Sequence, residues 1–268
     1  MNNPSQISAI FETRRICIRN PFNELQEMNK SLYQKSAFWL ILFFGFAVFG
    51  FWKSYYSPSD KDLSFYQHFH GISMTVWCLI LIGQAFLIRF KKYDIHRVIG
   101  KSSFVIFPIL ILSTFLLIHF SLGSSGSINT RTLNSMALMV NATLILIVIY
   151  GLGMYFRKER LTHARYMVCT IFPMFTPITD RIIYNYIRPL VPLAPKIEGM
   201  PIVPFYGFLL ADMIVLGLVI WDWKTHKRKD VFLIVLGLLL IYHISAFTFY
   251  RFDFWRSFTE WFLGLNLT

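Results

Sequence analysis

The sequence predicts an all-α membrane protein: a polytopic bundle of about seven transmembrane helices, with the N-terminus inside and the C-terminus outside. Of its 268 residues, 55% are hydrophobic, 18% are aromatic and only 15% are charged. Soluble domains are about 25% charged. Several uninterrupted apolar stretches reach the roughly 20 residues that a helix needs to cross a bilayer. A soluble fold of this length would have too little polar surface to cover its apolar mass.

Seven apolar runs, bounded by charged or turn-forming residues, are the predicted spans. In chain order they cover residues 36–52, 65–90, 98–120, 133–156, 164–187, 204–221 and 231–250. No small-residue cleavage site follows the first run, so we expect a retained anchor. The predicted organisation is a cytoplasmic N-terminal segment (1–35), a seven-helix transmembrane domain (36–250) and an interfacial C-terminal tail (251–268).

The distribution of Lys and Arg predicts the orientation. The N-terminal segment and the connections at 89–101, 157–165 and 224–229 hold 18 of these residues, whereas the remaining connections and the C-terminal tail hold seven. An excess of Lys and Arg marks the cytoplasmic side. The net charge of +12 is therefore spread as membrane topology requires, and we expect no nucleic-acid partner.

The outer connections and the tail predict turns and one interfacial helix. The segments SLGSSGS and RPLVPLAPKIEGMP are rich in Pro, Gly and Ser, which favours turns over a folded domain. The aromatic residues after position 250 suit the headgroup level of an amphipathic helix. Cys17, Cys78 and Cys169 are far apart and lack metal-ligand spacing, so they imply no disulfide framework.

Ionisable side chains at membrane depth are costly, so each is a candidate functional residue. Asp212 lies eight residues inside the outer end of the sixth span, and His243 lies about as deep in the seventh. With a rise of about 1.5 Å per residue, the two side chains are roughly level. A charge-assisted Asp212–His243 pair is therefore geometrically reasonable.

The fifth span contains two prolines, in the segment FPMFTPITDRI. Pro173 and Pro177 each remove a helical hydrogen bond, and Asp180 and Arg181 follow near the outer boundary. Two interpretations are open. One is a helix kink stabilised by a local Asp–Arg network, and the other is an outward-facing polar cavity shared with the sixth and seventh spans.

One face of the second span is a partly polar seam. His70, Met74, Trp77, Leu81 and Gln84 recur at intervals of three and four residues, which places them on one helix face. His70 either contacts a ligand or serves in packing and interfacial anchoring. The outer polar site proposed from the sequence comprises His70, His119, Asp180, Arg181, Asp212 and His243.

Two histidines begin spans on the cytoplasmic side. His96 and His163 each stand near an arginine at such a start, so they should lie at similar depth on two helices. Two histidines at one level are how membrane proteins hold a b-type haem, because the iron takes one nitrogen on each face. Arg97 and Arg165 could pair with the haem propionates. Alternatively, these residues bind lipid headgroups and enforce topology.

The segments HRVIGKSSF and LTHARYMVCTIFPMFTPITDRI resemble an uncharacterised family of bacterial multi-pass membrane proteins. That family has an HR-x-x-G start to one span and an H-x-x-x-M segment with a later arginine in another. The resemblance covers about residues 70–182. It implies the bacterial inner (plasma) membrane as the location and implies no established activity.

A weaker resemblance is to the di-haem transmembrane cytochromes b. Their second span opens with H-P-x-x-M and ends in an arginine; His70, Met74 and Arg89 fit this pattern, with glycine in place of the proline. Two later spans of these cytochromes carry cytoplasmic-side histidines, which His96 and His163 match in order and orientation. The resemblance implies that this pair holds a haem.

The chain departs from those cytochromes at the outer haem. They supply its second ligand from the start of the fourth span, where NSMALMVNAT has no histidine. Met136 or Met139 could ligate in principle, and His119 is an alternative partner for His70. The resemblance therefore favours one haem over two.

Four classes of function follow. The leading one is a b-type haem-binding redox protein with His96 and His163 as axial metal ligands. It would carry electrons to a quinone, a metal or a redox partner, with the outer polar site as acceptor or substrate site. A small-solute transporter would use the outer polar residues and a proline hinge, although no inverted repeat is visible.

The third class is a membrane-embedded metal-dependent enzyme, and the fourth is a non-catalytic sensory or assembly subunit. A zinc enzyme needs three or four converging ligands, for which His70, His119 and His243 are the outer candidates. A retinal protein is excluded, because the seventh span has no lysine for a Schiff base and the predicted orientation is opposite.

Overall fold

The computed structural model describes residues 21–57, 62–123 and 127–268, with side chains from residue 35 onward. Cys17 and most of the predicted segment 1–35 lie outside these described residues. Within these described ranges, six helices are long and apolar enough to cross a membrane, so the all-α, multi-pass membrane class is confirmed. Their elements are α2 (Pro21–Phe51, continued by a π-helical turn at Trp52–Tyr56), α3 (Phe65–Arg89), α4 (Tyr93–Gly123), α5 (Thr130–Tyr155), α8 (Pro204–His226) and α9 (Val231–Thr248, continued by a 3-10 turn at Phe249–Arg251).

The fifth predicted span, 164–187, is not one continuous helix. It is divided into α6 (Arg160–Cys169), a 3-10 turn (Phe172–Met174) and α7 (Phe175–Tyr186). Pro173 lies in the 3-10 turn; it has no N–H, and its ring clashes with the carbonyl four residues earlier, so α6 ends before it. Pro177 lies in the first turn of α7, where a missing N–H is tolerated. Pro173 thus produces the helix break, and Pro177 is compatible with the start of the next helix.

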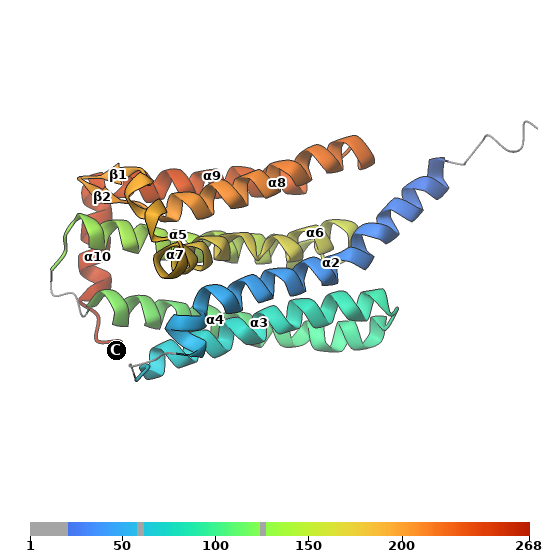
Figure 1. Ribbon diagram of the computed structural model, residues 1–268. Coiled ribbons are helices and arrows are strands. Elements are labelled where there is room, and N and C mark those ends of the chain that lie inside the picture. The colour runs from blue at the N-terminus through green and yellow to red at the C-terminus, as the bar shows by residue number, and fades with distance from the viewer. Residues whose placement is uncertain (1–20, 58–61, 124–126) are drawn as a thin grey trace, which may run out of the picture.

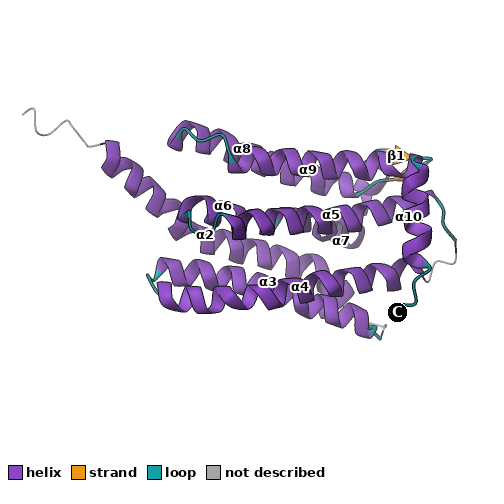
Figure 2. Cartoon of the chain, turned by 180° about the vertical axis from the view of Figure 1, so that it is seen from behind, coloured by secondary structure: helices purple, strands orange, loops and turns teal. Residues whose placement is uncertain are grey.

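The helices lie side by side along one direction, and the front and back views agree on their arrangement (Figure 1, Figure 2). α10 (Asp253–Leu263) lies across one end of the bundle, beside a small hairpin of β1 (Lys196–Ile197) and β2 (Met200–Pro201). The α3–α4 turn and the C-terminal end of α8 lie at the opposite end. We call these the α10 end and the basic end, because the Lys- and Arg-rich connections are at the latter.

The connection after α7 forms a 3-10 helix (Arg188–Leu193) and then the hairpin. Its two turn residues, Glu198 and Gly199, have φ angles of 48° and 80°. A two-residue hairpin turn of this kind requires positive φ at both positions. This region agrees with the turns expected from its Pro- and Gly-rich sequence.

The broken segment is held in the bundle by close helix packing. α7 packs against both α2 and α8. A Cβ placed on Gly50 of α2 would lie 2.9 Å from the carbonyl oxygen of Ile178, and one on Gly207 of α8 would lie 2.7 Å from the Cα of Thr176. Glycines let the backbones of membrane helices approach closely. Gly50 and Gly207 therefore allow α7 to sit between two full-length helices.

Substitution of Gly207 by Ala is expected to destabilise the protein by about 1–3 kcal/mol, because the new methyl group would overlap the α7 backbone. Gly217→Ala, on the same helix, is the matched control: no described atom lies within 4 Å of the Cβ it would add. Thermal unfolding in detergent measures the effect. Equal midpoints for the two variants would contradict the assigned α7–α8 contact.

The C-terminal tail forms the predicted amphipathic helix. On α10, Trp255, Thr259 and Phe262 are buried, whereas Phe254 and Trp261 are exposed. The indole Nε1 of Trp255 donates to the carbonyl oxygen of Leu133 at 3.0 Å. This hydrogen bond attaches α10 to the first turn of α5 and fixes the helix across the bundle end.

Candidate functional site

The structure brings His96 and His163 together at the basic end. They come from the first turns of α4 and α6 and lie close enough to interact electrostatically. The Nδ1 atom of His163 is 2.7 Å from the carbonyl oxygen of Gly153. A carbonyl oxygen only accepts, so Nδ1 carries a proton and Nε2 of the neutral ring has a free lone pair. This is the ring orientation found in metal-ligating histidines, whose second nitrogen donates to a backbone carbonyl.

His96 is oriented by Gln84 of α3. The side-chain amide of Gln84 satisfies its neighbours when its NH2 group faces His96 and its oxygen faces the backbone N–H of Gly100. In that orientation the amide nitrogen donates to His96 Nδ1 and lies 3.2 Å from the His96 carbonyl oxygen, and the amide oxygen lies 3.1 Å from the Gly100 nitrogen. Gln84, the last residue of the partly polar face predicted on α3, therefore contacts His96.

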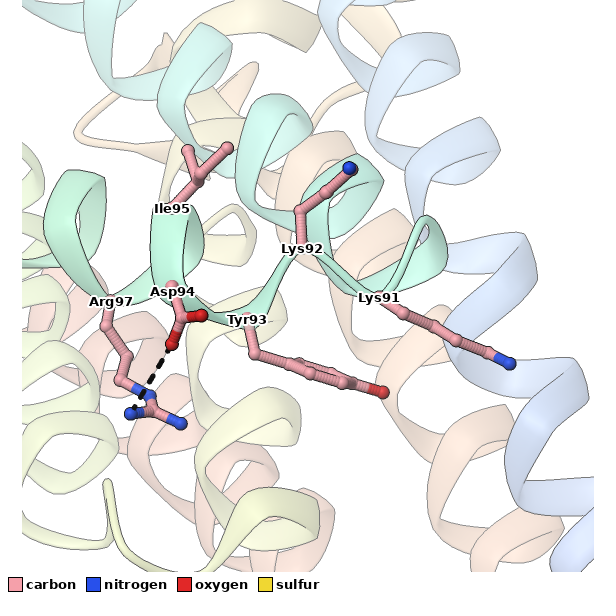
Figure 3. A pocket seen from close by; sticks show the side chains of 6 residues that line it. All are labelled: Lys91, Lys92, Tyr93, Asp94, Ile95 and Arg97. Carbon is pink, nitrogen blue, oxygen red and sulfur yellow. Dashed lines mark ion pairs between the residues drawn. The ribbon is translucent and has the colours of Figure 1, made fainter.

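The two arginines predicted to serve this site have different surroundings. The side chain of Arg97 is 73% exposed and lies 3.8 Å from Asp94. It lines a hollow of about 420 Å³ at the α3–α4 turn together with Lys91 and Lys92. Figure 3 shows Arg97 and Asp94 turned toward each other, with Lys91 projecting away from them. Arg97 remains available to an anionic group.

Arg165 is instead committed to a buried ion pair that the sequence analysis missed. Its Nη2 and Nε atoms donate to the two carboxylate oxygens of Asp222 on α8, at 2.7 and 3.2 Å. The two side chains are 1% and 3% exposed. His226, one turn later, lies 2.8 Å from the same carboxylate. The only signal for this site in the sequence is an acidic residue at the edge of the basic cluster WDWKTHKRK.

Asp212 and His243 form the predicted pair. Asp212 Oδ2 lies 3.0 Å from His243 Nδ1, which joins α8 to α9 at membrane depth. The imidazole stacks on Phe208 with ring centroids 4.0 Å apart. The other carboxylate oxygen, Oδ1, is buried and has no hydrogen-bond partner among the described residues. The expectation of a level Asp–His pair is therefore confirmed, and one acceptor position of the carboxylate is left unused.

Asp180 and Arg181, for which a local network and a shared outer cavity were both open, interact electrostatically. Among the described residues Asp180 Oδ1 is buried without a partner, whereas Arg181 is exposed and lies over the ring of Phe51, 5.8 Å from its centroid. Asp180 is close enough to Tyr242 of α9 to interact with it electrostatically. Asp180 also interacts electrostatically with Tyr184, which lies on the same helix, α7.

The remaining outer histidines lie in separate places. His70 Nδ1 is 3.3 Å from Thr114 Oγ1 and 3.4 Å from Ser113 Oγ, so it packs between α3 and α4. His119 Nδ1 is 2.7 Å from Thr268 Oγ1, beneath α10. The described residues contain no group of three His, Cys, Asp or Glu side chains that could hold a metal ion. The three outer histidines, His70, His119 and His243, therefore occupy three separate locations.

An apolar groove of about 550 Å³ opens between α4 and α5. It is lined by Phe107, Pro108, Ile111, Leu112, Phe115, Ile147, Tyr150 and Gly151. Its polar boundary is the Tyr150 hydroxyl, 3.0 Å from Ser103 Oγ. Gly151 is two residues from Gly153, whose carbonyl orients His163. On α5, one edge of the groove therefore lies within one helical turn of the residue that orients His163.

Comparison of the chain with protein-family models, with curated proteins and with solved structures finds no match.

Proposed function

We propose that this multi-pass membrane protein is a redox protein of the bacterial inner membrane that holds one b-type haem between His96 and His163. The observation that carries the proposal is the placement of these two histidines in the first turns of α4 and α6, near enough to interact electrostatically, with His163 held by the Gly153 carbonyl. Haem iron takes an axial ligand on each face, and His163 Nε2 is free for that role.

Seven crossings, with the N-terminus in the cytoplasm and the C-terminus outside, are part of the proposal. Six come from the long apolar helices, and α6, the 3-10 turn and α7 together supply the seventh. Broken helices are tolerated at membrane depth where protein surrounds them, and α7 is packed between α2 and α8. This count places every Lys- and Arg-rich connection on one side, as the positive-inside rule requires.

The residues of this site have distinct tasks in the proposal. A bound haem supplies one-electron redox chemistry. His163 presents its lone pair, and exposed Arg97 pairs with a propionate. Arg165 holds α6 to α8 through Asp222 and so positions the helix that carries His163. The apolar groove between α4 and α5 favours an isoprenoid quinone as partner, because it offers a hydrocarbon tail a path from the bilayer toward the site.

The absorbance of protein purified from haem-replete cells tests this function. A Soret band and a reduced-minus-oxidised α-band are expected, at about one haem per chain. Colourless protein that remains colourless when titrated with haemin in detergent would show that the histidine pair does not bind haem.

A second function, a proton-coupled carrier, is favoured by the Asp212–His243 pair. Transporter sites form beside broken helices near the bilayer midplane, and intramembrane Asp–His pairs serve as proton relays. Asp212 keeps one unpaired carboxylate oxygen among the described residues, and α8 packs directly on the broken α7. In this function Asp212 and His243 exchange a proton.

For the carrier, Asp212→Asn is expected to reduce proton uptake by proteoliposomes to the background rate, because the amide keeps the hydrogen bond but cannot take up a proton. A pH-sensitive dye inside vesicles with an imposed potassium diffusion potential measures the flux. Asp253→Asn, at an exposed position of α10, is the control and should transport like wild type. Unchanged flux in Asp212→Asn would exclude this residue as the relay.

A further inference from the structure

The geometry points to Gln84 as a positioning residue that selects the tautomer of His96 and thereby decides whether this histidine can ligate iron. This inference rests on the proposed haem function. It concerns a side chain on α3, a helix that contributes neither of the two histidines.

The hydrogen-bond partners of the two histidines favour opposite tautomers. His163 donates from Nδ1 to Gly153, which leaves the lone pair on Nε2. His96 accepts at Nδ1 from the Gln84 amide, so a neutral ring carries its proton on Nε2. A protonated Nε2 has no lone pair for a metal. Only His163 is therefore ready to act as an axial ligand.

Haem binding requires His96 to move its proton from Nε2 to Nδ1. The proton count of the ring does not change, but Nδ1 then becomes a donor and needs an acceptor. Rotation of the Gln84 amide places Oε1 where the NH2 group was and provides that acceptor. In the rotated orientation Oε1 also faces the His96 carbonyl oxygen and the NH2 group faces the Gly100 N–H, so the amide gives up its two backbone contacts to serve the new tautomer.

A carboxamide can serve both tautomers, whereas a carboxylate can serve only one and an aliphatic side chain can serve neither. A carboxylate at position 84 accepts only and therefore favours the Nδ1–H tautomer, with the Nε2 lone pair directed away from α3. A leucine offers no hydrogen bond and leaves the ring orientation unset. Gln84→Glu and Gln84→Leu therefore test the same hydrogen bond in two ways: the first favours the Nδ1–H tautomer of His96, and the second removes the bond.

Nitrogen-15 spectra of histidine-labelled protein without haem test the tautomer directly. Wild type should show the Nε2–H form at His96 and the Nδ1–H form at His163. Gln84→Glu should convert His96 to Nδ1–H and leave His163 unchanged. Gly83→Ala, one residue away with no described atom within 4 Å of its added Cβ, should match wild type. An Nδ1–H form of His96 in wild type, or an unchanged tautomer in Gln84→Glu, would overturn the inference.

Haem titration and potentiometry provide the second measurement. Gln84→Leu should bind haem about 10–100-fold more weakly, the usual effect of removing a hydrogen bond behind a metal ligand. Gln84→Glu should retain haem and lower its midpoint potential, because a carboxylate makes the imidazole a stronger electron donor. Equal affinity and potential in all variants would contradict the positioning role. If wild type binds no haem, the proposed function fails, while the nitrogen-15 result still decides the role of Gln84.

Discussion

His96→Ala and His163→Ala are each expected to abolish the haem absorbance of the purified protein. Each substitution removes one of the two nitrogens proposed to bind the iron. Among the described residues, the first turns of α4 and α6 hold no other histidine that could replace it. A methyl group in place of an imidazole also leaves space that water can enter. The reduced-minus-oxidised spectrum, normalised to protein concentration, is the measurement.

His68→Ala is the matched control for these variants. His68 is exposed, and it lies two residues from His70 at the far end of α3 from Gln84. Its removal should leave the spectrum intact. Size-exclusion profiles equal to that of wild type are required for all three variants, so that loss of colour reports loss of the ligand. Full haem occupancy in either His96→Ala or His163→Ala would disprove the assigned axial pair.

Arg165→Ala and Asp222→Ala are each expected to destabilise the folded protein by about 3–5 kcal/mol, because either one leaves a buried charge without its partner. Both side chains are at most 3% exposed, and the bidentate geometry uses both carboxylate oxygens. The pair joins α6 to α8. Equilibrium unfolding in mixed SDS micelles, followed by tryptophan fluorescence, measures the loss.

The double variant Arg165→Met, Asp222→Leu should recover most of that stability, because an apolar pair of similar volume avoids the cost of the unpaired charge. The exposed Asp94–Arg97 pair provides the control: Arg97→Ala should leave the unfolding midpoint nearly unchanged, as solvent screens such contacts. Single variants at 165 and 222 with wild-type stability would show that the ion pair does not hold α6 in place.

Several features of this protein could be predicted because they depend on local composition. Apolar run length predicted the six long helices, since a helix needs about 20 such residues to cross a bilayer. Proline chemistry predicted a disturbance at Pro173. Helical rise alone placed Asp212 level with His243, and the structure has the two 3.0 Å apart.

Other features depended on which helices are neighbours, which periodicity does not encode. The ion-pair partner of Arg165 is 57 residues away on α8. The sequence therefore could not show whether Arg165 is paired within the protein or is available to a haem propionate. His70 and His119 were grouped with Asp212 by depth, but depth does not specify position around the bundle. His70 contacts Thr114 of α4, and His119 contacts Thr268, which follows α10.

The sequence by itself determined that this chain is a helical, multi-pass membrane protein, because the length of each apolar run is a local property that does not depend on which helices are neighbours. It also placed His96 and His163 at equivalent starts of two helices. Only the tertiary structure decided that α7 packs between α2 and α8. It also decided that Arg165 forms an ion pair with Asp222 and that the Gln84 side chain contacts His96. Those outcomes depend on the rotation and pairing of helices, which are set by close packing at positions such as Gly50 and Gly207.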